Sequence, residues 1–430
     1  MNKQNRLTGN IHRATPRLKH VLSGLFSGGT PDTNNDEYWA AAGEGIAWVA
    51  IGDMSTKDRV EVTEKRITES GIASKRLCVL PPGTLIYSMY ASMGHVAELA
   101  IPATINQALL GLEFADGVEW GFAKWWLRHL QPLLIAEASS NTQDNLNADK
   151  VRNLPFPKIE FRHQSCIGNY LDKETARIDS LISEKERMLV LLEEKRAVLI
   201  SRLVTRGVDP NAPLKPSGHE WLGEIPAHWD LCQLKRTWAS SDYGLSESIR
   251  DEGDIAVLRM SCIVDGRVDV SKSGMITEVD GHLLLRRNDL LFNRTNSLDQ
   301  IAKVGLVDFD PEEPLTFASY LVRIRTNHRV MPEYLVELLN ASLFLEFARK
   351  SAIPSIGQAN LSPTRYGEIH IPLPPKPEQK EIVAFLERDA ETSTPVREHI
   401  RSSVALLRER RAALIAAAVT GQIPLKEMME

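Results

Sequence analysis

The sequence has few of the residues that build a covalent or metal-held framework. Only four cysteines occur in 430 residues, and Cys78, Cys166, Cys232 and Cys262 lie far apart with no C-x-x-C pair or Cys/His cluster. Structural zinc sites and disulfide frameworks need closely grouped ligands or regularly paired thiols, so this spacing argues against both. We expect isolated, reduced thiols and no bound metal.

Long hydrophobic runs are missing too. No apolar stretch approaches the roughly 20 residues that a bilayer-spanning helix needs. The first residues, MNKQNRLTGNIHRATPRLKH, are basic but lack the apolar block of a secretory signal. The sequence therefore predicts a cytoplasmic protein that does not contact a membrane.

Motifs for catalysis are also lacking. The chain has no G-x-x-x-x-G-K-[ST] loop for nucleotide triphosphates and no G-x-S-x-G elbow for a serine hydrolase. Its eleven histidines are scattered without the spacing of metal ligands. We expect a protein that is not an enzyme and that carries no cofactor.

What the sequence does have is a duplication. When the chain is compared with itself, Gln164 aligns with Gln379, an offset of 215 residues (379 − 164), and the register holds without a gap through Thr205. Within Leu191–Thr205, nine of fifteen positions are identical to their counterparts. Because the offset is about half the chain, it indicates a duplicated module, in which one globular region is followed by one helix.

Each repeated segment is predicted to be a long helix. Apolar residues recur every seven positions while charges fill most other faces, which is typical of a helix with a single partner. The nearest partner is the other copy, and at about 1.5 Å per residue each rod is roughly 60 Å long. Pro395 is expected to break or kink the second helix near Ser393. The apolar positions expected to face the partner helix, which we call the seam, are Leu171, Ile178, Leu192, Leu199, Leu386, Ile400, Leu407 and Leu414.

The globular regions, 1–153 and 215–370, read as mixed α+β domains. Short strand-like runs such as GIAWVAI and DLLFNRT are separated by Gly, Pro, Asn and Asp. Each region also has one helical run, WGFAKWWLRHLQPLL in the first and PEYLVELLNASLFLEFARK in the second. A proline-rich connector at 207–229 leads into the second region.

Two fused copies imply pseudo-twofold symmetry, and DNA is the commonest ligand that matches such spaced readers. The net charge of −5 does not exclude DNA, because phosphate contacts depend on the local placement of Lys and Arg. Loops rich in Gly, Ser, Asn and Gln can approach phosphates and base edges, although the same composition is typical of ordinary turns. The candidate DNA-binding residues are Ser27, Gly28, Thr30, Ser140, Asn141, Gln143, Asn293, Arg294, Asn296, Ser355 and Gln358.

Over nearly its full length the chain resembles the specificity subunits of type I restriction-modification systems. The resemblance rests on the order and duplication of several short motifs. They are SGGTP from Ser27, NQALLGL from Asn106, WLGEIPAHW from Trp221, DLLFNRTNS from Asp289, ASYLVRIR from Ala318 and the segment PLPPKPEQKEIV before the second helix. The implied fold is α+β, with two pseudo-symmetric α/β target-recognition domains separated by two long antiparallel α-helices that form a coiled coil.

The resemblance also implies a division of the chain into four parts. Residues 1–157 are the first target-recognition domain and 158–207 the central spacer helix. Residues 208–374 are the linker with the second target-recognition domain, and 375–430 are the C-terminal spacer helix.

The implied function is noncatalytic recognition of double-stranded DNA, in which each domain reads one half of a bipartite target. The helices are expected to set the gap and to dock two modification subunits, which are S-adenosylmethionine-dependent adenine methyltransferases. A restriction and translocation subunit is a further implied partner. Two alternatives stay open: a specificity subunit for a fused methyltransferase and nuclease, or a coiled-coil assembly protein unrelated to DNA.

Overall fold

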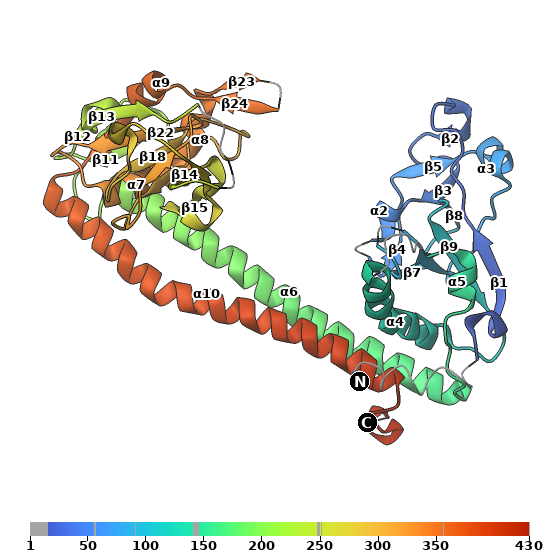
Figure 1. Ribbon diagram of the computed structural model, residues 1–430. Helices are drawn as coiled ribbons and strands as arrows, with labels where there is room; N and C mark the ends of the chain where they lie inside the picture. The colour runs from blue at the N-terminus through green and yellow to red at the C-terminus, as the bar shows by residue number, and fades with distance from the viewer. Residues whose placement is uncertain are drawn as a thin grey trace. The chain divides into compact units, whose positions relative to one another are not determined.

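The structure is a computed structural model, and it describes residues 16–55, 57–90, 92–140, 146–246, 250, 252–355 and 357–429. The chain divides into two compact units. Unit 1 combines residues 1–185 with 402–430, and unit 2 is formed by residues 186–401. Each unit contains one globular domain and one end of each long helix (Figure 1).

Unit 1 is built on two sheets. A five-stranded sheet has the order β1-β9-β6-β7-β4, and a four-stranded sheet has the order β2-β5-β3-β8. The strands are β1 Leu22–Ser27, β2 Trp39–Ala40, β3 Ile46–Val49, β4 Arg59–Val60, β5 Lys65–Ile67, β6 Leu85–Ser88, β7 Val96–Leu99, β8 Ala103–Ile105 and β9 Leu109–Phe114. All four residues of β6 are buried, which fits its central position between β9 and β7.

Unit 2 has a six-stranded sheet of order β13-β22-β18-β20-β16-β15 and a three-stranded sheet of order β17-β14-β21. Three small sheets, β10-β11, β12-β25 and β19-β24-β23, complete it. The strands are β10 Leu214–Pro216, β11 Glu224–Pro226, β12 Asp230–Gln233, β13 Trp238–Tyr243, β14 Ile255–Leu258, β15 Ile263–Val264, β16 Arg267–Val268, β17 Gly274–Ile276, β18 Leu290–Asn293, β19 Thr295–Asn296, β20 Val304–Leu306, β21 Leu315–Phe317, β22 Leu321–Thr326, β23 Ile353–Ser355, β24 Gln358–Asn360 and β25 His370–Leu373.

The two units repeat the same strand pairings. The order β1-β9-β6-β7-β4 in unit 1 matches β13-β22-β18-β20-β16 in unit 2, and β5-β3-β8 matches β17-β14-β21. Parallel pairs occur at the same places, β4 with β7 and β16 with β20, and again β3 with β8 and β14 with β21. The duplication seen in the helices therefore extends through both globular domains, where the sequences have diverged.

Shorter helices cover the sheets. In unit 1 the aromatic face of α4, with Phe122, Trp125 and Trp126, packs into a core with Leu85 and Tyr87 of β6. The second helical run is interrupted at Ala341, whose extended backbone separates α7 from α8. The helices of the chain are α2 Ile51–Met54, α3 Glu69–Lys75, α4 Trp120–Ser140, α5 Ala148–Arg152, α6 Phe161–Arg206, α7 Pro332–Asn340, α8 Ser342–Lys350, α9 Pro363–Glu368, α10 Lys376–Val419 and α11 Leu425–Met428.

The long helices α6 and α10 begin at equivalent positions, because Phe161 and Lys376 are 215 residues apart (376 − 161). The break expected near Ser393 is wrong, since α10 continues through Pro395. A proline removes one backbone N–H and leaves the carbonyl of Glu391, four residues earlier, without its helical partner. Glu391 is exposed, so water can satisfy that carbonyl and the helix persists.

A buried glutamine ties each long helix to its domain. In unit 1, Oε1 of Gln164 accepts the backbone N–H of Glu119 at 2.9 Å, just before α4. Its Nε2 donates to the carbonyls of Gly117 at 3.2 Å and Ile159 at 2.7 Å. The side chain therefore joins the start of α6 to the start of α4.

The counterpart in unit 2 makes the same three bonds. Oε1 of Gln379 accepts the N–H of Met331 at 2.8 Å, just before α7, and Nε2 donates to the carbonyls of Arg329 at 3.0 Å and Pro374 at 2.9 Å. We call Gln164 and Gln379 the latch glutamines. Because both are buried, each latch fixes the angle at which a long helix leaves its domain.

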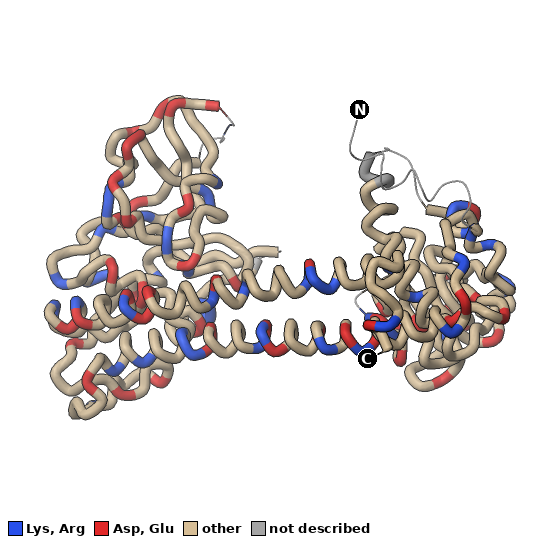
Figure 2. The backbone as a smooth tube through the Cα atoms, turned by 90° about the horizontal axis from the view of Figure 1, so that it is seen from below, with Lys and Arg blue, Asp and Glu red and all other residues tan. Residues whose placement is uncertain are grey.

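The two long helices pack against each other within each unit. In unit 1, Ile178 and Ile182 of α6 form a buried cluster with Val404 of α10, and Asp179 pairs with Arg411 at 2.8 Å. Figure 2 shows acidic and basic residues along both helices.

In unit 2, ion pairs at 3.4 Å join Arg196 to Asp389 and Glu193 to Arg401. The partner number falls as the α6 number rises, so the helices run antiparallel.

The predicted seam residues differ in burial. Leu171, Ile178, Leu386 and Ile400 are buried, whereas Leu192, Leu199, Leu407 and Leu414 are half-buried. The seam prediction did not include the buried Ile182 and Val404. Across the described ranges, no helix has both the length and the apolar character needed to cross a bilayer.

Candidate nucleic-acid interface

Corresponding strand ends meet at one edge of each large sheet. In unit 2, Tyr243 at the end of β13 and Asn293 at the end of β18 lie opposite the first residues of β22. In unit 1, Ser27 at the end of β1 and Ser88 at the end of β6 lie opposite the first residues of β9. We call each of these the strand-end edge of its unit. Predicted residues from the two halves of the chain, Ser27 and Asn293, thus lie on equivalent edges.

Gly28, which follows Ser27, is required by the chain's own backbone. A Cβ on Gly28 would lie 2.0 Å from the carbonyl oxygen of Asn106 and 2.3 Å from that of Ile105. Gly244 in unit 2 has the same environment, with a Cβ 2.3 Å from the carbonyl oxygen of Ala318. The close approach that was expected to serve DNA therefore already serves the packing of β1 against the start of β9.

The other predicted residues of unit 1 are only partly described. Ser27 is exposed, and the hydroxyl of Thr30 donates to Oε1 of Gln107. Ser140 is the last residue of α4. Asn141 and Gln143 lie outside the described residues.

Arg294 is the charged group of the unit 2 edge. Its guanidinium lies over the ring of Tyr243, with the Cζ atom 5.0 Å from the ring centroid, and Nη1 donates to the carbonyl of Ser319 at 3.5 Å. Nε has no hydrogen-bond partner among the described residues. Tyr243 is 52% exposed and Tyr320, beside Ser319, is 47% exposed. A guanidinium held against one exposed ring and near another suits contacts to phosphates and base edges.

The two asparagines beside Arg294 differ in exposure. Asn293 is 2% exposed, so its side chain is not on the surface as the DNA-binding prediction required. Its position in the middle of the sheet explains this, because β18 pairs with strands on both sides. Asn296 is half-buried, and its Oδ1 accepts the N–H of Ser297 at 2.8 Å.

A small three-stranded sheet brings further predicted residues close to Arg294. In β19, Thr295 and Asn296 pair with Asn360 and Ala359 of β24. The same strand begins at the exposed Gln358, which lies opposite Ser355 of β23. Arg294, Asn296, Ser355 and Gln358 are therefore neighbours in the fold, although 61 residues separate Arg294 from Ser355 in the sequence (355 − 294).

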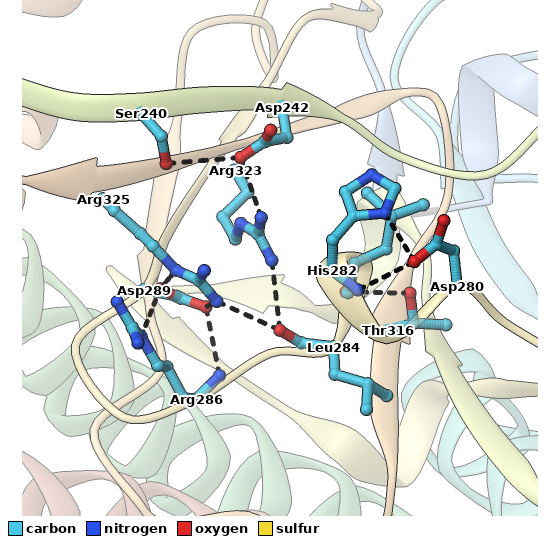
Figure 3. Close-up of polar contacts among 11 residues, drawn as sticks. Ser240, Asp242, Asp280, His282, Leu284, Arg286, Asp289, Thr316, Arg323 and Arg325 are labelled. Atoms are coloured by element: carbon cyan, nitrogen blue, oxygen red, sulfur yellow. Dashed lines mark hydrogen bonds and ion pairs between the residues drawn. The ribbon is translucent and has the colours of Figure 1, made fainter.

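A buried ion network supports the unit 2 edge from behind (Figure 3). Arg323, which is 2% exposed, donates through Nη2 to Asp242 Oδ2 at 2.8 Å and through Nη1 to the carbonyl of Leu284 at 3.1 Å. Arg325 makes a two-bond pair with Asp289, at 2.7 and 3.0 Å. These hydrogen bonds raise the pKa of the Arg325 guanidinium.

This network was not predicted from the sequence, and it assigns both arginines a structural role. Two arginines two residues apart on a strand face the same way, so the pattern V-R-I-R carried a signal for paired charges. Because Asp242 precedes Tyr243, the network also holds the end of β13 in place. Among the described residues, no three His, Cys, Asp or Glu side chains are grouped so as to hold a metal ion.

Comparisons with known proteins point to one class. Residues 230–396 match the family model described as "Type I restriction modification DNA specificity domain". The chain is 23% identical over 425 residues to the type I restriction enzyme MjaIX specificity subunit of Methanocaldococcus jannaschii, which covers 94% of this chain and 92% of that protein. It is 25% identical over 299 residues to the EcoKI specificity subunit of Escherichia coli K12, covering 67% of this chain and 61% of that one.

The fold agrees with this class. A chain from a solved structure titled as the structural basis of complex assembly and conformational transition of the type I R-M system matches with a TM-score of 0.68. The match is 14% identical and covers 95% of this chain and 99% of the other. The family model, the relatives and the fold all indicate a specificity subunit of a type I restriction-modification system, and they support a DNA-recognition role for this chain.

Proposed function

We propose that the chain is a noncatalytic subunit in which the domain of each unit reads one half of a bipartite DNA target. The observation that carries this proposal is the pair of equivalent strand-end edges on two copies of one fold. The copies present different side chains at these edges, Ser27 in unit 1 against Tyr243 and Arg294 in unit 2. Two readers with different surfaces suit two half-targets of different sequence.

The unit 2 edge has the chemistry for base and phosphate contact. The guanidinium of Arg294 can donate two parallel N–H bonds to the O6 and N7 atoms of a guanine in the major groove, or to one phosphate. Stacking on Tyr243 limits the orientations of the guanidinium before DNA arrives, which lowers the entropic cost of ordering it. The exposed amide of Gln358 adds a second group that can read a base edge.

The long helices supply the spacing and the docking surface in this proposal. Their antiparallel pairing within each unit and the latch glutamines make them the elements that set the gap between half-targets. On α6 the exposed side chains of Met188, Leu191 and Val198 are spaced by three and seven residues, which places them on one face of the helix. An apolar stripe in water suits a helix from another protein, and we assign it to two adenine methyltransferase subunits.

A restriction and translocation subunit would complete the complex. A fused methyltransferase and nuclease would use the same surfaces, and the coding sequence beside that of this chain distinguishes the two cases. A coiled-coil assembly protein unrelated to DNA would need the paired helices but not the exposed Tyr243, Arg294 and Tyr320, which therefore favour the DNA-binding function.

The proposal is tested with the complex of this chain and its methyltransferase subunits. We expect sequence-specific binding of a duplex that weakens steeply as salt rises, because phosphate contacts release counterions. The chain alone, supplied with S-adenosylmethionine and DNA, should transfer no methyl group. If the complex forms but protects no duplex from footprinting, the chain is an assembly protein and the proposal is wrong.

A further inference from the structure

Unit 2 buries a tryptophan in a socket at the end of α6. Trp229 is fully buried, and its Nε1 donates to Glu378 Oε2 at 2.8 Å. The indole lies on Gly207, the residue after α6, so closely that a Cβ on this glycine would be 3.1 Å from Cζ2 of the ring. Nζ of Lys215 donates to the Trp229 carbonyl at 2.7 Å. The connector between the two domains thus closes this end of the unit with one aromatic side chain.

Unit 1 contains the equivalent socket. The offset of 215 residues takes Glu378 to His163 and the buried Ile382 and Val204 to Ile167 and Val419. Gly421 follows α10 as Gly207 follows α6, with φ of +74° against +75°. The unit 1 residues His163, Ile167, Val419 and Gly421 line an apolar cleft of about 550 Å³, together with Trp126 and Leu425.

The decisive difference is what lies on the glycine. A Cβ on Gly421 would meet no atom within 4 Å, whereas the same position in unit 2 touches the Trp229 ring. The short motif Pro-Leu-Lys, which in unit 2 brings Lys215 to the Trp229 carbonyl, recurs in unit 1 at 424–426. Unit 1 therefore has the walls of the socket and the lysine beside it, but the described residues place no indole there.

We propose that this cleft binds an extended segment of a partner protein that inserts a tryptophan side chain. The filled socket of unit 2 specifies the chemistry of the occupant, an indole with an N–H donor at its rim. Residues 1–15 contain no Trp, Tyr or Phe, so the chain has no aromatic side chain to offer from that segment. Neutral His163 can accept the indole N–H in place of Glu378.

The strength expected of this contact follows from the buried ring. A tryptophan buries on the order of 150 to 250 Å² of surface, and such residues dominate the binding energy of small interfaces. Replacing this ring by a methyl group should therefore weaken binding by at least about tenfold, which corresponds to about 1.4 kcal/mol. The cleft lies within unit 1, so its occupancy does not depend on whether either domain reads DNA.

The experiment uses the full chain and a labelled peptide that copies residues 219–231, HEWLGEIPAHWDL, as the probe. Fluorescence anisotropy should show saturable binding, and the control peptide with Trp229→Ala should bind at least about tenfold more weakly. His163→Glu in the protein restores the carboxylate of unit 2 and should tighten binding by about tenfold. Thr420→Trp, at an exposed position lining the cleft, should abolish binding.

Three results would overturn the proposal. One is equal binding of the two peptides, and a second is no binding by either the natural protein or His163→Glu. The third is binding that appears only after residues 1–15 are deleted, because the cleft would then belong to that segment and not to a partner. A Thr420→Trp protein that fails to fold would not decide the matter, and His163→Glu gives the independent reading.

Discussion

At the scale of single residues, the reading of one half-target depends most on Arg294. We expect Arg294→Ala to weaken DNA binding by the assembled complex by about 1 to 3 kcal/mol and to relax specificity at one base pair of one half. Competition with duplexes altered at single positions measures both effects. Arg388→Ala removes the same charge from an exposed position of α10 and is the matched control. Equal losses in the two variants, spread over all sequences, would remove Arg294 from the reading surface.

The latch glutamines make a stability prediction. Gln379→Leu leaves the N–H of Met331 and the carbonyls of Arg329 and Pro374 without their buried partner. Each unpaired group costs about 1 to 3 kcal/mol, so we expect the free energy of unfolding to fall by at least about 3 kcal/mol. Urea unfolding measures the loss. The exposed Gln422→Leu should change it by less than about 0.5 kcal/mol, and similar values for both variants would refute the latch.

Glu337 on α7 makes the stability of unit 2 depend on pH. Burial raises the pKa of this carboxyl, opposed by Arg196 and Arg267 and reinforced by Glu387. The folded chain therefore keeps the proton at pH values where the unfolded chain has lost it, so this contribution to stability is present at low pH and lost as pH rises through the raised pKa. We expect Glu337→Gln to be more stable than the natural chain at pH 7 and to lose that advantage in acid. Urea unfolding at a series of pH values checks this, and parallel curves would contradict it.

The sequence identified some residues correctly by position but not by role. Ser27, Arg294 and Gln358 lie on the strand-end edge or beside it, whereas Asn293 is buried and Gly28 serves its own backbone. Residue type and loop composition cannot tell which face of a strand a side chain occupies until the pairing is known.

The latch glutamines show the same limit. Gln164 and Gln379 began the aligned repeat, yet their shared role appears only in the hydrogen bonds. Those bonds reach backbone groups that lie 45 and 48 residues away, at Glu119 and Met331.

At the scale of elements, the apolar stripe on α6 is predicted to hold the methyltransferase subunits. We expect Met188→Glu to reduce assembly of the complex at least about tenfold, because a charge on an apolar contact surface is costly. Size-exclusion chromatography with the methyltransferase subunits measures assembly. Val190→Glu introduces the same charge at a 52% exposed position on another side of the helix and should leave assembly unchanged. A loss in both variants, or in neither, would rule out this docking face.

The long helices were the elements that the sequence predicted best. A seven-residue apolar period with charges elsewhere is a strong local signal, and it led to α6 and α10. Pro395 was overestimated, because its cost depends on whether the freed carbonyl reaches water, which the sequence does not show. The run 332–350 was taken as one helix and is two, since nothing in the letters of Asn340 and Ala341 marks the extended turn between them.

At the scale of the whole molecule, the duplication is visible in the sequence of the helices and only in the structure of the domains. A strand needs buried residues in the right alternation, and many sequences satisfy that, so β13 and β1 pair alike with little shared sequence. The latch glutamines and the helix starts keep their register because both helices meet the same geometric requirement. The four-part division of the chain stays a prediction, and the compact units assign one end of each long helix to each domain.

The central claim is that two similar domains read two separate halves of one DNA target at a fixed gap. Its most direct test is a map of methylated adenines in cells that express this chain with its methyltransferase subunits, compared with cells in which residues 208–374 are replaced by the matching domain of a relative. We predict a two-part motif for the natural chain, and for the graft a motif with one half changed, the other half kept and the gap unaltered. A graft that changes both halves, or a methylation pattern that is the same with and without this chain, would contradict the account.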